Sequence, residues 1–96
     1  MQALEEFLRK MRRQRADWMN PVDDEILEYI DEAGAATPQS ISDEIGKNND
    51  YIGKRCRKLM SYGLLERPSR GLYVLTETGT GYLNTSVDAS SLEEGD

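Results

Sequence analysis

Apolar residues recur at helical spacing between residues 48 and 63. Ile52, Cys56, Leu59 and Met60 fall at positions i, i+4, i+7 and i+8, which places them in one stripe along a helix. Gly63 follows them and can adopt the left-handed conformation in which many helices end. The pattern therefore predicts a helix that buries one face. Its start holds three cap candidates, Asn48, Asn49 and Asp50.

The opposite face of this helix is basic. The positions that the stripe leaves for solvent or a ligand include Lys54, Arg55, Arg57 and Lys58. A helix held by one face, with cations on the other, is suited to docking on an anionic molecule. The alternative, an ordinary solvated helix face, stays open at this point.

Two helices are predicted before it, because each begins with a cap residue followed by proline. The first runs from Asn20-Pro21 to Gly34, and the second covers residues 37–46, from a Thr-Pro pair to a glycine. Only a few residues separate the second from the basic helix. A short helix, a tight turn and a basic helix form the sequence pattern of a helix-turn-helix.

After Gly63 the pattern changes to that of strands. Residues 64–67 and 72–76 are rich in strand-favouring residues, and a turn-forming cluster joins them. Thr76 is placed to cap a last helix that ends near Leu83. This order predicts an α+β, mainly α fold: a winged helix-turn-helix domain over residues 20–84, with a three-helix core, a two-stranded wing and a C-terminal helix.

Two segments flank this domain. Residues 2–19 are predicted to form an extra N-terminal helix, because their apolar residues recur at spacings of three, four and seven. These residues are Leu4, Phe7, Leu8, Met11 and Trp18. They are buried either by their own domain or by a second subunit, so segment 1–19 is a candidate dimerisation element. Residues 85–96 are acidic and rich in Ser and Thr, which predicts a disordered tail.

Composition excludes several kinds of site. The 96 residues fit one domain without a large catalytic cavity. One Cys and no His exclude an internal disulfide, a Cys/His zinc site and histidine catalysis. Cys56 is interpreted as a core residue, with redox sensing as the alternative. The carboxylates of residues 21–46 lack calcium-loop spacing and are predicted to form a solvated face, so we expect no enzyme, metal or cofactor.

The charge is sorted along the chain, although its net value is −6. Residues 47–71 carry seven cations and two anions, whereas residues 21–46 carry eight anions and no cation. A basic block inside an acidic chain is typical of a phosphate-facing surface. The acidic excess is also typical of proteins from a salt-rich cytoplasm, with an acidic protein of an ordinary cell as the alternative. No membrane span or signal peptide is evident, which favours a cytoplasmic protein.

Several runs carry a resemblance to a known family: residues 12–19, 23–28, 36–38, 49–52, 59–67 and 71–76. They resemble haloarchaeal winged-helix proteins similar to the repressor of phage phiH. The resemblance covers about residues 11–90 and is most specific at Trp18-Met19 and at residues 62–67. It implies a DNA-binding transcriptional regulator of a salt-loving archaeon. Gly53 departs from the pattern, because such helices often carry Ser there.

In a winged helix, the N-terminal half of the basic helix enters the major groove of double-stranded DNA. The residues nearest to base edges should then be Asn49, Asp50, Gly53, Lys54 and Arg57. Lys54 and Arg57 are the best candidates for base contacts, because Lys and Arg pair with guanine O6 and N7. The other members of the predicted DNA-binding surface are Lys47, Asn48, Tyr51, Arg55, Lys58, Arg67 and Arg70. Most of these are expected to touch phosphates, with packing as the alternative for Tyr51, pairing with Glu66 as the alternative for Arg67, and the minor groove within reach of Arg70.

The predicted function is a sequence-specific transcriptional regulator, a repressor, that binds DNA as a homodimer. Phosphate contacts weaken at high salt, by a log-log slope of about −0.9 per phosphate, so base contacts and a dimer are expected to supply specificity. The dimer, joined through the N-terminal helix, would place two recognition helices in major grooves about 34 Å apart on a pseudo-palindrome. Two alternatives stay open. One is a protein-interaction module of a transcription or chromatin assembly, and the other is a sequence-tolerant architectural DNA-binding protein.

Overall fold

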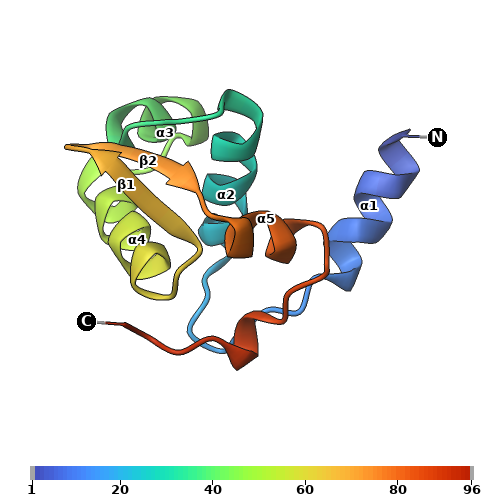
Figure 1. Cartoon of the computed structure of the whole chain (residues 1–96). Coiled ribbons are helices and arrows are strands. Elements are labelled where there is room, and N and C mark those ends of the chain that lie inside the picture. The colour runs from blue at the N-terminus through green and yellow to red at the C-terminus, as the bar shows by residue number, and fades with distance from the viewer. Residues whose placement is uncertain (1, 96) are drawn as a thin grey trace.

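The computed structural model describes residues 2–95, which form a mainly helical domain with one hairpin (Figure 1). In chain order the elements are α1 (Gln2–Arg12), α2 (Pro21–Ala33), α3 (Pro38–Ile45), α4 (Asn49–Ser61), β1 (Leu65–Ser69), β2 (Leu72–Leu75), α5 (Glu77–Leu83) and the 3-10 turn η1 (Ala89–Ser91). The two strands are antiparallel. This order confirms the predicted winged helix-turn-helix, with α2, α3 and α4 as its three-helix core.

Local hydrogen bonds explain why the predicted starts of α3 and α4 are confirmed. Thr37 Oγ1 accepts from the Ser40 N–H at 3.1 Å at the start of α3. Asn48 Oδ1 accepts from the Asp50 N–H at 2.8 Å at the start of α4. These side chains satisfy amide groups that the first turn of a helix leaves unpaired. Gly46 follows α3 with a φ of 81°, a left-handed conformation that favours glycine.

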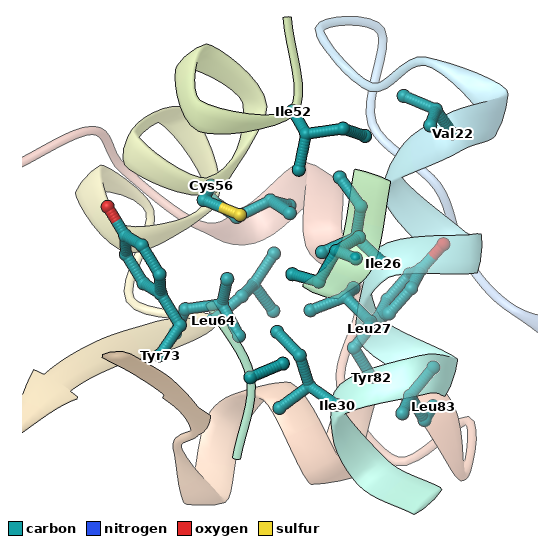
Figure 2. Close-up of a cluster of buried hydrophobic side chains, with 14 of the residues drawn as sticks. Val22, Ile26, Leu27, Ile30, Ile52, Cys56, Leu64, Tyr73, Tyr82 and Leu83 are labelled. Carbon is teal, nitrogen blue, oxygen red and sulfur yellow. The ribbon is translucent and has the colours of Figure 1, made fainter. Parts of the chain in front are cut away.

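The core lies between α2, α3, α4, α5 and the hairpin, and Figure 2 shows part of it. Ile52 and Cys56 of α4 point toward Ile26 of α2, and Tyr82 of α5 lies beside α2. The buried apolar residues of the described chain are Val22, Ile26, Leu27, Ile30, Ala36, Ile41, Ile52, Cys56, Leu59, Leu64, Leu65, Tyr73, Tyr82, Leu83 and Ala89. The stripe that predicted α4 is thus its core-facing side.

Backbone hydrogen bonds, in addition to the chain connections, join the wing to the helical core. Leu65 pairs with Leu75, and the register becomes irregular toward the tip, where Pro68 in β1 lacks an N–H. Ala36, which precedes α3, exchanges backbone hydrogen bonds of 3.0 and 2.8 Å with Tyr73 of β2. The position of the wing is therefore tied to the start of the helix-turn-helix.

The N-terminal helix is shorter than predicted. α1 ends at Arg12, so the prediction of one helix over residues 2–19 is wrong. Arg13 instead turns toward the domain, where its Nε donates to the Leu83 carbonyl at 3.1 Å. Trp18 therefore does not lie on α1. Its ring stacks on Tyr62, with ring centroids 3.9 Å apart and planes at 8°.

The C-terminal segment folds against the domain, so the predicted disorder is wrong for residues 85–95; residue 96 lies outside the described residues. The buried Ala89 donates its N–H to the Gln14 carbonyl at 2.9 Å. Farther on, the Gly95 N–H donates to the Ser61 carbonyl at 2.6 Å. A polar composition concealed this packing, because the apolar residues that anchor the segment, Val87, Ala89 and Leu92, stand apart among polar residues.

Candidate nucleic-acid interface

The solvent-facing side of α4 carries free cations. Ile52, Cys56 and Leu59 are fully buried, and the helical repeat puts Lys54 and Arg57 on the opposite, exposed side. Neither Lys54 nor Arg57 forms a salt bridge within residues 2–95. Their charges are therefore available to an anionic ligand.

A shallow hollow collects the residues that were predicted to lie nearest to base edges. Its lining consists of Asn49, Asp50, Gly53, Lys54 and Arg57 of α4, together with Pro38 of α3. A Cβ placed on Gly53 would lie 3.4 Å from Arg57 Nη1, so the guanidinium covers this glycine. Lys, Arg and Asn supply the donors that guanine and adenine edges accept. The structure thus brings all five sequence-predicted residues together on one surface.

The start of α4 offers a further cation. Lys47 is exposed, next to the capping residue Asn48. Asn48 Oδ1 is occupied by the cap, which leaves its amide group as the free donor. Tyr51 is 37% exposed, and its hydroxyl accepts from Asn20 Nδ2 at 3.1 Å. The Tyr51 ring thus remains accessible while its hydroxyl is linked to the segment before α2.

Arg55 is an exception to the predicted phosphate contacts. Its Nε and Nη2 donate to Oδ1 and Oδ2 of Asp23 at 2.9 and 2.6 Å, and Nη2 also donates to the Trp18 carbonyl at 3.2 Å. The Arg55 side chain is 15% exposed, and that of Asp23 is completely buried. The hydrogen bond to Asp23 raises the pKa of Arg55. The donors of Arg55 are thus engaged inside the domain, and its predicted contact with DNA phosphate stays a prediction that would require their release.

Lys58 is also partly engaged. Its Nζ lies 3.0 Å from Glu94 Oε2 in the C-terminal segment and 5.6 Å from the ring centroid of Tyr62. The Ser61 hydroxyl donates to the same Glu94 oxygen at 3.2 Å, and these hydrogen bonds lower the pKa of Glu94. Since both charged side chains are more than one-third exposed, this pair is weak. Lys58 could exchange Glu94 for a phosphate.

The wing supplies two more free cations. Arg67 lies in β1 and Arg70 in the turn that follows it, and both are exposed. Neither forms a salt bridge in the described part of the chain. Each could therefore meet a DNA backbone beside the groove that α4 occupies.

The acidic residues of α2 are not all solvated, which corrects the prediction for residues 21–46. Asp23 and Asp24 are buried in the first turn of α2. Asp24 Oδ1 accepts from the Tyr82 hydroxyl at 2.7 Å, and Asp24 Oδ2 accepts from Arg15 at 2.8 Å. Burial opposes the Arg15 charge, but Asp24 outweighs this effect and raises the pKa of Arg15. The first turn of a helix favours anions, which explains their position in α2. No pattern in the sequence indicated that their partners would be Arg15, Arg55 and Tyr82.

Cys56 lies in the core with no exposed surface. Burial raises the pKa of its thiol to about 12, so the thiolate required for redox sensing is not formed near neutral pH. This supports the interpretation of Cys56 as a core residue. Among residues 2–95 no group of three His, Cys, Asp or Glu residues is arranged to hold a metal ion. The helices of this part of the chain are also too short or too polar to cross a membrane.

Comparison with known proteins agrees with this geometry. The family model described as winged helix-turn-helix phage repressor matches residues 11–95. The crystal structure of the PhiH1 repressor-like protein from Haloarcula marismortui matches with a TM-score of 0.80 and 38% sequence identity. The match covers 85% of this chain and 96% of that chain. A search of curated proteins finds no match.

Proposed function

The chain belongs to the winged helix-turn-helix phage repressor family and is thus a DNA-binding regulator, and we propose that it represses transcription at specific operators. In this proposal α4 enters the major groove of double-stranded DNA. Lys54 and Arg57 contact base edges, and Arg67 and Arg70 of the wing contact the adjacent backbone or minor groove. The family carries no implication of enzymatic activity.

The hollow on α4 is the observation that carries this proposal. Its residues combine free cations with an amide and a carboxylate, and such a mixture can distinguish base pairs as well as bind phosphate. A surface that only coats DNA needs cations alone. The relative from Haloarcula marismortui supports a salt-loving source, and we extend the proposal to a salt-rich cytoplasm.

The test is selection of binding sites from random duplex DNA, at low and at high potassium chloride. Wild type is compared with Lys54→Ala and Arg57→Ala, and with Arg9→Ala as control, because Arg9 is an exposed cation on α1. We expect wild type to recover a sequence motif. In each α4 variant, the preference for the correct base should fall at one or two positions of that motif, by about 5- to 150-fold (1–3 kcal/mol) per lost base contact. Arg9→Ala should recover the wild-type motif.

Other results would point to the other functions. Binding without any motif would replace a specific regulator with a sequence-tolerant architectural protein. Absence of binding at every salt concentration would favour a protein-interaction module. For the wing, Arg70→Ala should reduce the log-log salt slope by about 0.9 without altering the motif, if Arg70 neutralises one phosphate.

A further inference from the structure

α1 presents an apolar stripe to solvent. Leu4, Phe7, Leu8 and Met11 are 58, 58, 37 and 67% exposed, and no residue of α1 is buried. A monomeric protein rarely leaves such a continuous stripe uncovered. The family match begins at residue 11, so this helix is largely an addition to the shared domain.

The stripe faces away from the rest of the domain. The opposite side of α1, with Glu6, Arg9 and Lys10, lines a groove shared with α2, and Lys10 Nζ lies 3.6 Å from Glu28 Oε2. Arg13, directly after α1, donates to Glu28 Oε2 at 2.6 Å, and its side chain is only 6% exposed. The charged face of α1 is thus held toward α2, which leaves the apolar face outward.

We propose that a second copy of this chain covers the stripe, with the two α1 helices antiparallel. The charged residues along the edges of the stripe favour the antiparallel arrangement. Glu5 and Arg12 are seven residues apart and therefore lie along the same edge of the stripe. A twofold axis perpendicular to the helices reverses the partner and brings the same edges of both copies together. Glu5 of each copy then meets Arg12 of the other.

The parallel arrangement satisfies fewer charges, because Glu5 of one copy would face Lys10 of the other, which already pairs with Glu28. Arg12 would face no anion. A twofold axis along the helices brings opposite edges together, and the other edge of the stripe carries Ala3 and Lys10. Neither Glu5 nor Arg12 forms a salt bridge inside the described chain, so both are available to a partner. The antiparallel pair joins opposite charges and buries the four apolar side chains together.

This dimer, if combined with the proposed function, holds two DNA duplexes. α4 and α1 lie on opposite sides of α2 (Figure 1), with the free cations of α4 facing away from the core and the α1 stripe facing outward on the other side. Joining two copies through α1 therefore turns their α4 surfaces away from each other. This arrangement differs from the sequence-based hypothesis of two recognition helices on one palindrome, and it bridges separate DNA segments.

The interface is small, which sets the concentrations for the test. Each α1 has 11 residues and is roughly 16 Å long, so a pair of them falls short of the ~1,200 Å² that stable interfaces bury. The dimer should therefore form at high protein concentration. Binding of two separate duplexes creates no additional contact between the two copies.

Sedimentation of the full chain without DNA tests whether the dimer forms. Because no DNA is present, the result does not depend on the proposed function. We expect a concentration-dependent dimer for wild type and for the control Gln2→Glu, which adds charge to the other face of α1. Phe7→Glu should be monomeric at the same concentrations, and the exposure of Phe7 makes loss of folding unexpected. Glu5→Arg and Arg12→Glu should each weaken the dimer several-fold at low salt, and the double variant should restore it.

Capture of a labelled duplex by an immobilised duplex then tests bridging. Wild type and Gln2→Glu should capture the second duplex, whereas Phe7→Glu should bind single duplexes normally and capture none. A wild type that is monomeric throughout, a dimer unaffected by Phe7→Glu, or binding of α1 to lipid vesicles in place of self-association would overturn the proposal. Failure of the double charge variant to restore the dimer would overturn the antiparallel geometry.

Discussion

Replacement of Arg55 by methionine tests the structural role assigned to this arginine. The buried Asp23 carboxylate accepts two hydrogen bonds from Arg55 and one, at 3.0 Å, from the Asn20 N–H. Removing one member of a buried ion pair costs about 3–5 kcal/mol. Since Arg55 is partly exposed, water can reach the abandoned carboxylate, and the Asn20 bond remains. We therefore expect a loss near the lower limit, about 3 kcal/mol of unfolding free energy.

Urea denaturation measures this loss, with Trp18 fluorescence and circular dichroism as probes. With a slope of roughly 1 kcal/mol per molar urea, the midpoint should fall by about 3 M. Arg57→Met is the matched control, because Arg57 is an exposed arginine on the same helix. It should change stability by less than about 0.5 kcal/mol but reduce DNA binding. Asp23→Asn combined with Arg55→Met removes both charges and should be more stable than Arg55→Met alone.

The opposite result would refute the assignment. If Arg55→Met retained the stability of wild type and lost DNA affinity as Arg57→Met does, Arg55 would be a DNA-contacting residue. The Asp23 ion pair would then contribute little to the fold.

Three further predictions concern the core. Tyr82→Phe removes the hydroxyl that donates to the buried Asp24, and it should lower the unfolding free energy by about 2 kcal/mol, as measured by urea denaturation. Cys56 should resist alkylation at pH 8 in the folded protein and react once urea unfolds the chain, because burial raises its pKa to about 12; rapid reaction of the folded form would contradict its core position. Gly79→Ala should destabilise the protein by more than the helical preference of alanine gains, because its Cβ would clash with the Leu64 carbonyl oxygen; an unchanged melting temperature would refute this.

The parts of the fold that sequence could predict depend on local signals. The Asn20-Pro21 and Thr37-Pro38 pairs place the starts of two helices within single residues, because capping and proline geometry act over one turn. The basic side of α4 followed from helical periodicity alone. These signals located the candidate DNA surface, including the residues that line its hollow.

The parts that sequence could not predict depend on distant partners. Arg55 and Arg57 are equivalent by composition, and only the fold places Asp23, 32 residues away, against one of them. The end of α1 was missed because Trp18 continues the apolar spacing, although its ring packs on Tyr62. The C-terminal segment was missed because its apolar anchors, Val87, Ala89 and Leu92, are isolated among polar residues, and its backbone bonds leave no trace in composition.

Burial divides the arginines into two groups that respond differently to dissolved ions. Arg13 and Arg55 hold carboxylates where ions have little access, whereas Arg57 faces solvent, where counterions compete with any phosphate. Rising ionic strength should therefore weaken phosphate contacts before it loosens the fold. In a cell whose internal salt varies, DNA binding would therefore change while the amount of folded protein stayed constant.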